Sequence, residues 1–259
     1  MIDFEKEFKA FFNHAADAAG AIALNYFRKI IPVDDKQDKS PVTQADREIE
    51  QTLRDMIRKQ FPTHGIIGEE FGRENEEAEF VWVIDPIDGT KSFVTGRPLF
   101  GTIIGLLHNG KPVMGVIDQA FTRERWFGID RQGAWYNSQP IKVAPPRPLH
   151  AARLYTGSIS MFDDANLDKF LTLCRTAKLT QYSCDCYAYG LLAMGWCDLI
   201  VEQCLALYDV AGAAPIITGA GGYIADWQGR PVSREYSGTI VIATSQDLAL
   251  EAIKILKNT

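Results

Sequence analysis

Two aspartates in the segment DPIDGT, at positions 85–90, are the side chains of this sequence best suited to chemistry. The apolar run Phe80–Ile84 predicts a buried strand that ends directly before Asp85, and the proline that follows fixes φ so that the chain turns there. Asp85, Asp88 and the Ile87 carbonyl between them form a cluster of hard oxygen ligands, which suits Mg²⁺ better than zinc. The alternative is an ordinary Asp-Pro or Asp-Gly turn without a ligand, and this segment alone leaves both interpretations open.

Three further carboxylates stand at the predicted ends of elements. Glu69 follows a short apolar strand in a turn that a glycine opens. Asp46 and Asp209 both stand at predicted helix starts, where capping of the helix is the alternative role. Carboxylates that lie close together repel one another, and two metal ions would neutralise them. Because two cations about 3.5–4 Å apart support in-line attack on a phosphate ester, the set predicts a metal-dependent phosphatase.

The residues that follow the aspartates offer a place for the phosphate group. The backbone amides of Gly89, Thr90 and the next residues are expected to open a helix and to cradle an anion. The four histidines are scattered, without the spacing of a metal site, and the sequence contains no nucleophile elbow, Walker loop or dinucleotide fingerprint. Histidine chemistry and nucleotide loops therefore do not compete with the carboxylates as explanations.

The elements that must position these side chains differ between the two halves of the chain. Apolar residues every three or four positions predict a long helix over 4–26, and a second helix begins at Thr43. A mostly antiparallel sheet follows, with strands expected at 66–67, 80–84, 99–107, 112–120 and 123–129. Beyond the proline-rich segment 144–148, the pattern predicts strands at 154–156, 198–202, 222–226 and 239–243, and helices at 165–177, 187–196, from 208 and at 248–257. We therefore expect an α+β or α/β protein with an N-terminal lobe, 1–148, that carries most metal ligands, and a C-terminal α/β lobe, 149–259.

Composition restricts the partners. The 259 residues are 46% hydrophobic and 23% charged, as in an ordinary globular protein. Acidic residues outnumber basic ones 33 to 27, which argues against nucleic acid or an anionic membrane as a partner. The longest uncharged run, 210–225, is too short and too rich in glycine and proline to span a bilayer. Five cysteines without a CxxC pair suggest free thiols and a cytoplasmic location, and a Cys184–Cys186 metal site is the weaker alternative.

Four segments together resemble the inositol monophosphatase superfamily. They are SPVTQAD at 40–46, GEE at 68–70, WVIDPIDGTKSF at 82–93 and YDVAGAAPIITGAGG at 208–222. Their order and spacing match, and the likeness runs from about residue 5 to residue 257. The resemblance implies a layered αβαβα fold, Mg²⁺-dependent hydrolysis of a small phosphate ester, and a homodimer.

The resemblance also implies roles for individual residues. Glu69, Asp85 and the Ile87 carbonyl would hold one metal, and Asp85, Asp88 and Asp209 a second, with Glu69 helping to place a weaker third. Mn²⁺ would be a possible substitute for Mg²⁺. The further assignments are these: Asp46 and Thr90 orient and deprotonate the attacking water, Gly89 and Thr90 contact phosphate, Glu70 supports its neighbour, and Lys36 lies on a loop near the metals.

Within this family, the segments 85–107, 115–128 and 185–195 resemble histidinol-phosphate phosphatases. Asp185, 24 residues before Asp209, would suit the ammonium group of histidinol, and capping of a helix is its alternative role. Glu202, seven residues before Asp209, stands where the family contacts its leaving group. The leading hypothesis is therefore hydrolysis of L-histidinol phosphate in histidine biosynthesis.

Two other functions remain as hypotheses: an inositol-1-phosphate or broad sugar-phosphate phosphatase, and a catalytically silent binding protein. The residues before Asp209 are Ala206 and Leu207, where the histidinol branch often has Lys-Pro. Thr218 and Gly219 likewise replace a segment that often carries a glutamate. These departures lie on the substrate side, so they weaken the substrate assignment more than the assignment of the reaction. The complete set of carboxylates argues against the silent protein.

Overall fold

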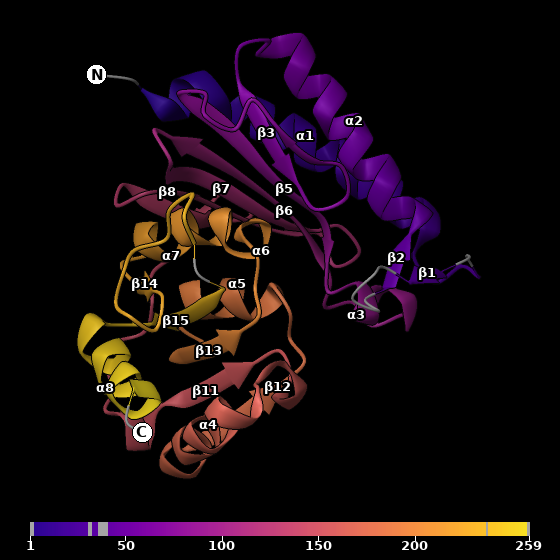
Figure 1. The fold of residues 1–259 in the computed structure, drawn as a ribbon. Coiled ribbons are helices and arrows are strands. Elements are labelled where there is room, and N and C mark those ends of the chain that lie inside the picture. The colour runs from indigo at the N-terminus through magenta and orange to yellow at the C-terminus, as the bar shows by residue number, and fades with distance from the viewer. Residues whose placement is uncertain (1–2, 31–32, 36–40, 237, 258–259) are drawn as a thin grey trace.

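The computed structural model describes residues 3–30, 33–35, 41–236 and 238–257. Figure 1 shows helices and sheets stacked in alternating layers, from the helix pair α1 and α2 to the pair α4 and α8. This arrangement is the layered αβαβα fold that the resemblance implies. Among the described residues, none of the helices combines the length and the apolar character that crossing a membrane requires.

The first layer consists of α1 (Phe4–Tyr26) and α2 (Gln44–Gln60), which pack side by side on one face of the first sheet. The buried face of α1 carries phenylalanines and alanines at helical spacing, among them Phe8, Phe12 and Ala19. In α2 the capping box predicted at Thr43 is present. The short strands β1 (Val33–Asp35) and β2 (Pro41–Thr43) pair antiparallel just before α2.

The second layer is an eight-stranded sheet in the order β10-β9-β8-β7-β6-β5-β3-β4. All neighbours are antiparallel except β3 and β5, which run parallel. The strands are β3 (Gly65–Gly68), β4 (Gly72–Glu74), β5 (Phe80–Asp88), β6 (Gly101–His108), β7 (Lys111–Gln119), β8 (Glu124–Ile129), β9 (Gly133–Tyr136) and β10 (Gln139–Pro140). The five-residue helix α3 (Thr90–Val94) leaves the sheet directly after β5.

The central layer contains α5 (Tyr187–Ala193), α6 (Leu207–Ala211) and α7 (Ala213–Gly219), which lie between the two sheets. A row of glycines across the first sheet lets α6 and α7 approach closely, because Gly115 is in register with Gly105 on β6 and Gly128 on β8. A Cβ atom at Gly115 would lie 2.0 Å from the carbonyl oxygen of Gly212. The small residues therefore set the distance between sheet and helices.

The second sheet has the order β12-β11-β13-β15-β14. Its strands are β11 (Arg153–Thr156), β12 (Leu179–Tyr182), β13 (Leu199–Gln203), β14 (Tyr223–Ala225) and β15 (Thr239–Ala243). The helices α4 (Asp164–Thr176) and α8 (Gln246–Lys257) form the last layer, and two short 3₁₀ turns lie at Leu149–Ala151 and Ile159–Met161.

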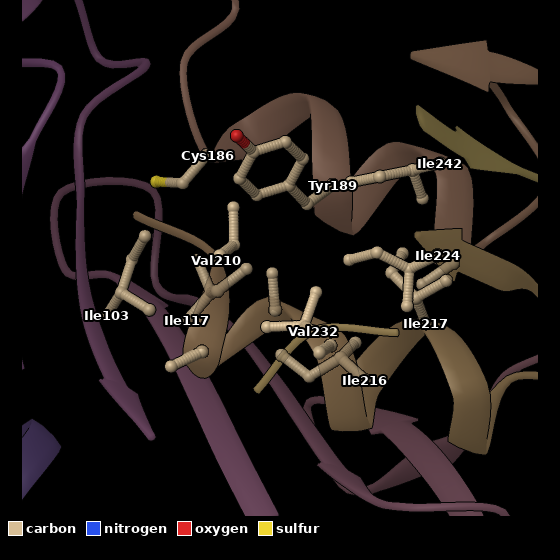
Figure 2. Packing of buried hydrophobic residues seen from close by; sticks show 14 of the residues in the cluster. Ile103, Ile117, Cys186, Tyr189, Val210, Ile216, Ile217, Ile224, Val232 and Ile242 are labelled. Atoms are coloured by element: carbon tan, nitrogen blue, oxygen red, sulfur yellow. The ribbon is translucent and has the colours of Figure 1, made fainter. Parts of the chain in front are cut away.

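One buried cluster joins the two sheets through the central helices. In Figure 2, Ile103 and Ile117 of the first sheet face α6 and α7, and Ile242 of the second sheet lies on the opposite side of the same cluster. Residues from both predicted lobes therefore share one core. The boundary at residue 148 stays a prediction. All strands of the first sheet precede it in the chain, and all strands of the second sheet follow it.

The sequence predicts the long elements better than the short ones. Six short strands are present in the structure and missing from the expectation: β1, β2, β4, β9, β10 and β12. β5 also continues to Asp88 instead of ending at Ile84, because the pairing with β6 resumes at Asp88 after an irregularity. The proline at position 86 is thus accommodated inside a strand.

Candidate active site

The acidic residues converge where β3 and β5 end. These two strands are parallel, with Gly68 in register with Ile84, so the residues that follow, Glu69 and Asp85, stand side by side at one edge. A cavity of about 260 Å³ opens at this edge. Its lining consists of Glu69, Asp85, Ile87, Asp88, Gly89, Thr90, Lys91, Asp185 and Asp209. Eight of the ten residues predicted for the site thus share one cavity, although they come from segments up to 140 positions apart.

Three carboxylates form the centre of this cavity. One oxygen from each of Asp85, Asp88 and Asp209 lies within 4.8 Å of the others. Asp85 and Asp88 reach the same point because β5 is irregular between them, and the Thr102 hydroxyl stabilises this irregularity by donating to the Pro86 carbonyl at 2.8 Å. Asp209 arrives from α6, which packs on β5 and β6.

Backbone amides orient two of the three carboxylates. The amide of Cys186 donates to Oδ2 of Asp88, and the amide of Ala206 donates to Oδ2 of Asp209, both at 2.5 Å. Charge-assisted bonds of this kind are short and fix a carboxylate in place. Asp209 therefore does stabilise the start of its helix, as its alternative role predicted, and lines the cavity as well.

The cluster is electrostatically strained without a cation. Burial raises the pKa of Asp85 well above its usual value, and the charges of Glu69, Asp88 and Asp209 raise it further. Burial likewise raises the pKa of Asp88, with the charges of Asp185 and Asp209 added, and it raises the pKa of Asp209 to about 7. Like charges held together in this way favour either a proton or a bound cation.

One buried oxygen tests whether a metal ion fits the site. Asp85 is 2% exposed, and its Oδ1 atom has no hydrogen-bond partner among the described residues. A buried polar atom without a partner is costly and calls for a ligand. The donors around it are all carboxylate or carbonyl oxygens, which is the ligand set of Mg²⁺. The residues present therefore fit a hard divalent cation.

Asp46 and Thr90, the pair predicted to activate water, differ in how they lie relative to the cavity. Oδ2 of Asp46 accepts hydrogen bonds from the amide of Thr43 at 2.8 Å and from its hydroxyl at 2.6 Å, as in the capping role. Burial raises the pKa of Asp46 to about 6 against these bonds. The Thr90 hydroxyl donates to the Ile87 carbonyl at 3.1 Å. Asp46 does not line the cavity, and its link to Thr90 stays a prediction.

Asp185 lines the cavity beside the carboxylate cluster. Its Oδ2 atom accepts a 2.6 Å hydrogen bond from the Ser92 hydroxyl, and its backbone is left-handed, with φ of 45°. Gly89 makes room for it, because a Cβ atom there would lie 2.8 Å from the same oxygen. The alternative role is wrong, since α5 begins at Tyr187 and the capping position belongs to Cys186.

Glu202 is buried behind the cavity and does not line it. Its Oε1 atom accepts a bond from the Gly157 amide at 2.8 Å, and its Oε2 atom accepts one from the Tyr189 hydroxyl at 2.6 Å. Burial raises the pKa of Glu202 to about 7. The predicted contact with the leaving group stays a prediction, because both oxygens are bonded within the protein.

Lys36 and Glu70 were predicted to lie near the metal ligands without binding the metal. Lys36 lies outside the described residues. The backbone amide of Glu70 donates to Oε2 of Glu50 at 2.7 Å, and the role of its side chain beside Glu69 stays a prediction. Lys91 lines the cavity and was not predicted. Its place directly after Thr90, a predicted phosphate contact, could have indicated this position.

The described thiols remain unpaired: the structure contains five free cysteines. Cys186 is buried in the core beside Gly101, where a Cβ atom would lie 2.8 Å from its sulfur. This position is that of a small apolar side chain and gives no support to a Cys184–Cys186 metal site.

Comparisons with known proteins show which family the chain belongs to. Residues 5–258 match the model of the inositol monophosphatase family, and the chain belongs to that family. It is a phosphomonoesterase by class, since family members act on small phosphate esters. Bifunctional phosphatase IMPL2 of Arabidopsis thaliana is 41% identical over 96% of this chain and 75% of the relative.

Two further comparisons bear on fold and substrate. A histidinol-phosphatase of Chlorobaculum parvum is 35% identical over 83% of this chain and 84% of that protein. The solved structure of an inositol monophosphatase from Zymomonas mobilis superposes with a TM-score of 0.90 at 37% identity and covers all of both chains. The fold and family are therefore shown, and these relatives carry two different substrates in their names.

Proposed function

We propose that this protein is a Mg²⁺-dependent phosphatase that hydrolyses L-histidinol phosphate to L-histidinol and phosphate. The observation that carries the proposal is the Asp185 carboxylate, which lines the same cavity as the acidic cluster. Ser92 occupies one of its oxygens, and the carboxylate is suited to bind the ammonium group of a substrate whose phosphate lies over the cluster. The histidinol-phosphatase of Chlorobaculum parvum supports this choice of substrate.

Each residue has a role in the proposed reaction. Glu69, Asp85, the Ile87 carbonyl, Asp88 and Asp209 hold two or three Mg²⁺ ions, with Mn²⁺ as a substitute. When bound, these ions supply Lewis-acid activation of water and stabilise the leaving oxygen. The backbone at Gly89 and Thr90 binds the phosphate group. Asp46, whose pKa lies near 6, takes the proton of the attacking water through Thr90.

The proposal is tested by comparing phosphate release from histidinol phosphate, inositol 1-phosphate and a simple aryl phosphate. We expect the largest kcat/KM for histidinol phosphate. The variant Asp185→Asn keeps the shape of the side chain and removes its charge, so KM for histidinol phosphate should rise about 10- to 100-fold. The aryl phosphate has no ammonium group, and its kcat/KM should change little.

Asp164→Asn is the matched control, because Asp164 is an exposed aspartate on the outer helix α4. It should leave all three substrates unaffected. Equal losses on histidinol phosphate and aryl phosphate in Asp185→Asn would show that Asp185 supports the site without binding the amine.

The second candidate function is that of an inositol monophosphatase. The Zymomonas mobilis structure favours it, because its fold is the same along the whole chain. Preference for inositol 1-phosphate in the same assay would establish this alternative and leave the metal chemistry unchanged. A homodimer and a cytoplasmic location are further parts of the proposal, and light scattering at several protein concentrations tests the first.

A further inference from the structure

A buried ion pair lies beneath the turn that carries Glu69. Glu50 and Arg54, one turn apart on α2, are 0% and 2% exposed, and their Oε1 and Nε atoms are 2.8 Å apart. Burying two charges costs desolvation free energy that the attraction between them scarcely recovers. Stability alone therefore explains this pair poorly, and its remaining contacts indicate another role.

Apart from a 3.5 Å ion pair between Arg54 and Glu74, these contacts go to the backbone immediately after Glu69. Glu50 accepts hydrogen bonds from the amides of Glu70 at 2.7 Å and Phe71 at 3.1 Å. Arg54 donates from Nη2 to the carbonyl of Gly72 at 2.5 Å. Glu70 and Phe71 of the turn between β3 and β4, and Gly72 at the start of β4, are thus bound to one helix.

Gly68 shows how closely the pair and the turn fit together. A Cβ atom at Gly68 would lie 2.0 Å from Oε1 of Glu50 and 2.9 Å from Nη2 of Arg54. The carboxylate therefore occupies the space that any other side chain at position 68 would need. The glycine is required by this contact, since its φ is not in the left-handed region.

Within the sheet, the turn is closed by the pairing of Gly68 with Gly72. β4 is a three-residue edge strand whose residues are all exposed. On the inner side, the amide of Glu69 donates to the Ile84 carbonyl at a long 3.3 Å. A ligand at the end of such a strand needs an anchor outside the sheet if its position is to stay fixed.

We infer that Glu50 and Arg54 are positioning residues for Glu69, which set the affinity of the site for divalent cations without touching the cation. The inference rests on the proposed role of Glu69 as a metal ligand. A merely structural pair would change the melting temperature and leave metal affinity alone.

Three variants separate these roles. Gly68→Ala displaces the carboxylate without changing any charge. Glu50→Gln places an amide group against two N–H donors and leaves Arg54 with only the more distant Glu74 carboxylate, 3.5 Å away, so it risks unfolding. The double variant Glu50→Gln/Arg54→Met removes both charges and fills the space with an apolar chain, which buried pairs often tolerate. Arg58→Gln is the control, because it breaks an exposed ion pair with Glu74, 2.8 Å long, and leaves the 69–72 turn bound.

The measurement is a titration with Mn²⁺ in which the free ion is followed by electron paramagnetic resonance. Circular dichroism confirms folding of each variant. We expect Gly68→Ala and the double variant to weaken Mn²⁺ binding by about 10- to 100-fold, as loss of outer-shell support does elsewhere. Their kcat should recover at high Mg²⁺, whereas Arg58→Gln should stay within about twofold of the parent protein.

Folded variants that bind Mn²⁺ with the affinity of the parent protein would overturn the inference and leave the proposed function intact. A parent protein that binds no Mn²⁺ would overturn both. The two failures are therefore distinguishable in one experiment.

Discussion

At the scale of single residues, buried carboxyl groups differ in what surrounds their oxygens. Both oxygens of Glu202 accept bonds from the protein, and Asp46 is bonded to Thr43. Oδ1 of Asp85 has no partner in the described part of the chain. Burial raises the pKa in all three cases, but only the third leaves a strong acceptor unsatisfied. This contrast distinguishes a candidate metal ligand from a carboxylate that already accepts hydrogen bonds from the protein.

A half-buried histidine gives a prediction for pH. Nε1 of Trp82 donates to Nδ1 of His64 at 3.1 Å, which requires that nitrogen to be unprotonated. Burial lowers the pKa of His64, against a smaller opposite effect of Glu79. The unfolded chain therefore binds the proton first as pH falls, and stability is lost from about pH 6.5 downward.

Urea unfolding between pH 5 and pH 8 measures this effect. The variant His64→Gln should flatten the decline in unfolding free energy below pH 6.5, while His14→Gln, at an exposed position on α1, should not. An identical pH profile for the parent protein and His64→Gln would contradict the assignment.

At the scale of elements, the approach of α6 and α7 to the first sheet places Asp209. The glycines at 105, 115 and 128 lie in register across β6, β7 and β8. A Cβ atom at Gly128 would lie 2.3 Å from Cα of Ile216 on α7. Sheet and helices are therefore in backbone contact along this row, and Asp209 is held over β5 as a consequence.

Gly115→Ala tests this contact. The added methyl group would meet the Gly212 carbonyl, so α6 and α7 must shift. We expect a loss of about 1–3 kcal/mol in unfolding free energy. Because Asp209 moves, we also expect kcat/KM to reach half its maximum only at a higher Mg²⁺ concentration. Chemical denaturation and a Mg²⁺ titration measure the two effects. Ala substitution at Gly157, whose backbone is not left-handed and where the nearest atom would lie 3.2 Å from an added Cβ, separates severe crowding from the general cost of replacing a glycine. Equal stability losses in the two variants would argue against close packing.

At the scale of the whole molecule, the cavity joins the first sheet to the central layer. Its carboxylates come from the turn after β3, from β5, from the segment before α5, and from α6. A cation bound there would hold these parts together and would stabilise only the folded chain. Ligand binding of this kind raises stability by about 2.7 kcal/mol at 100 times Kd.

Metal removal should therefore lower the melting temperature. In a chain of this size, 1 kcal/mol corresponds to roughly 2–4 °C, so saturating Mg²⁺ should raise the melting temperature by several degrees over protein in chelator. Asp85→Asn should lose most of this rise and most activity, yet melt higher than the parent protein in chelator, because a repelling charge is gone. Potassium chloride of equal ionic strength is the control, and an equal rise with that salt would contradict specific binding.

The sequence by itself determined the long helices, most sheet strands and the candidate metal ligands, because these depend on local patterns. Apolar periodicity predicted α1 and α2, and the spacing of acidic residues around glycines singled out Glu69, Asp85, Asp88 and Asp209. The resemblance to a known family extended this set to Asp185 and to the layered fold.

Only the tertiary structure decided what the remaining polar residues do. Short strands such as β4 and β12 are formed by pairing with neighbours, so their own residues carry no strong pattern. Ser92 and Asp185 are 93 positions apart, and Glu50 reaches the backbone 20 positions further on. Contacts of this kind depend on how the layers pack, and burial and unsatisfied hydrogen bonds follow from packing rather than from local sequence.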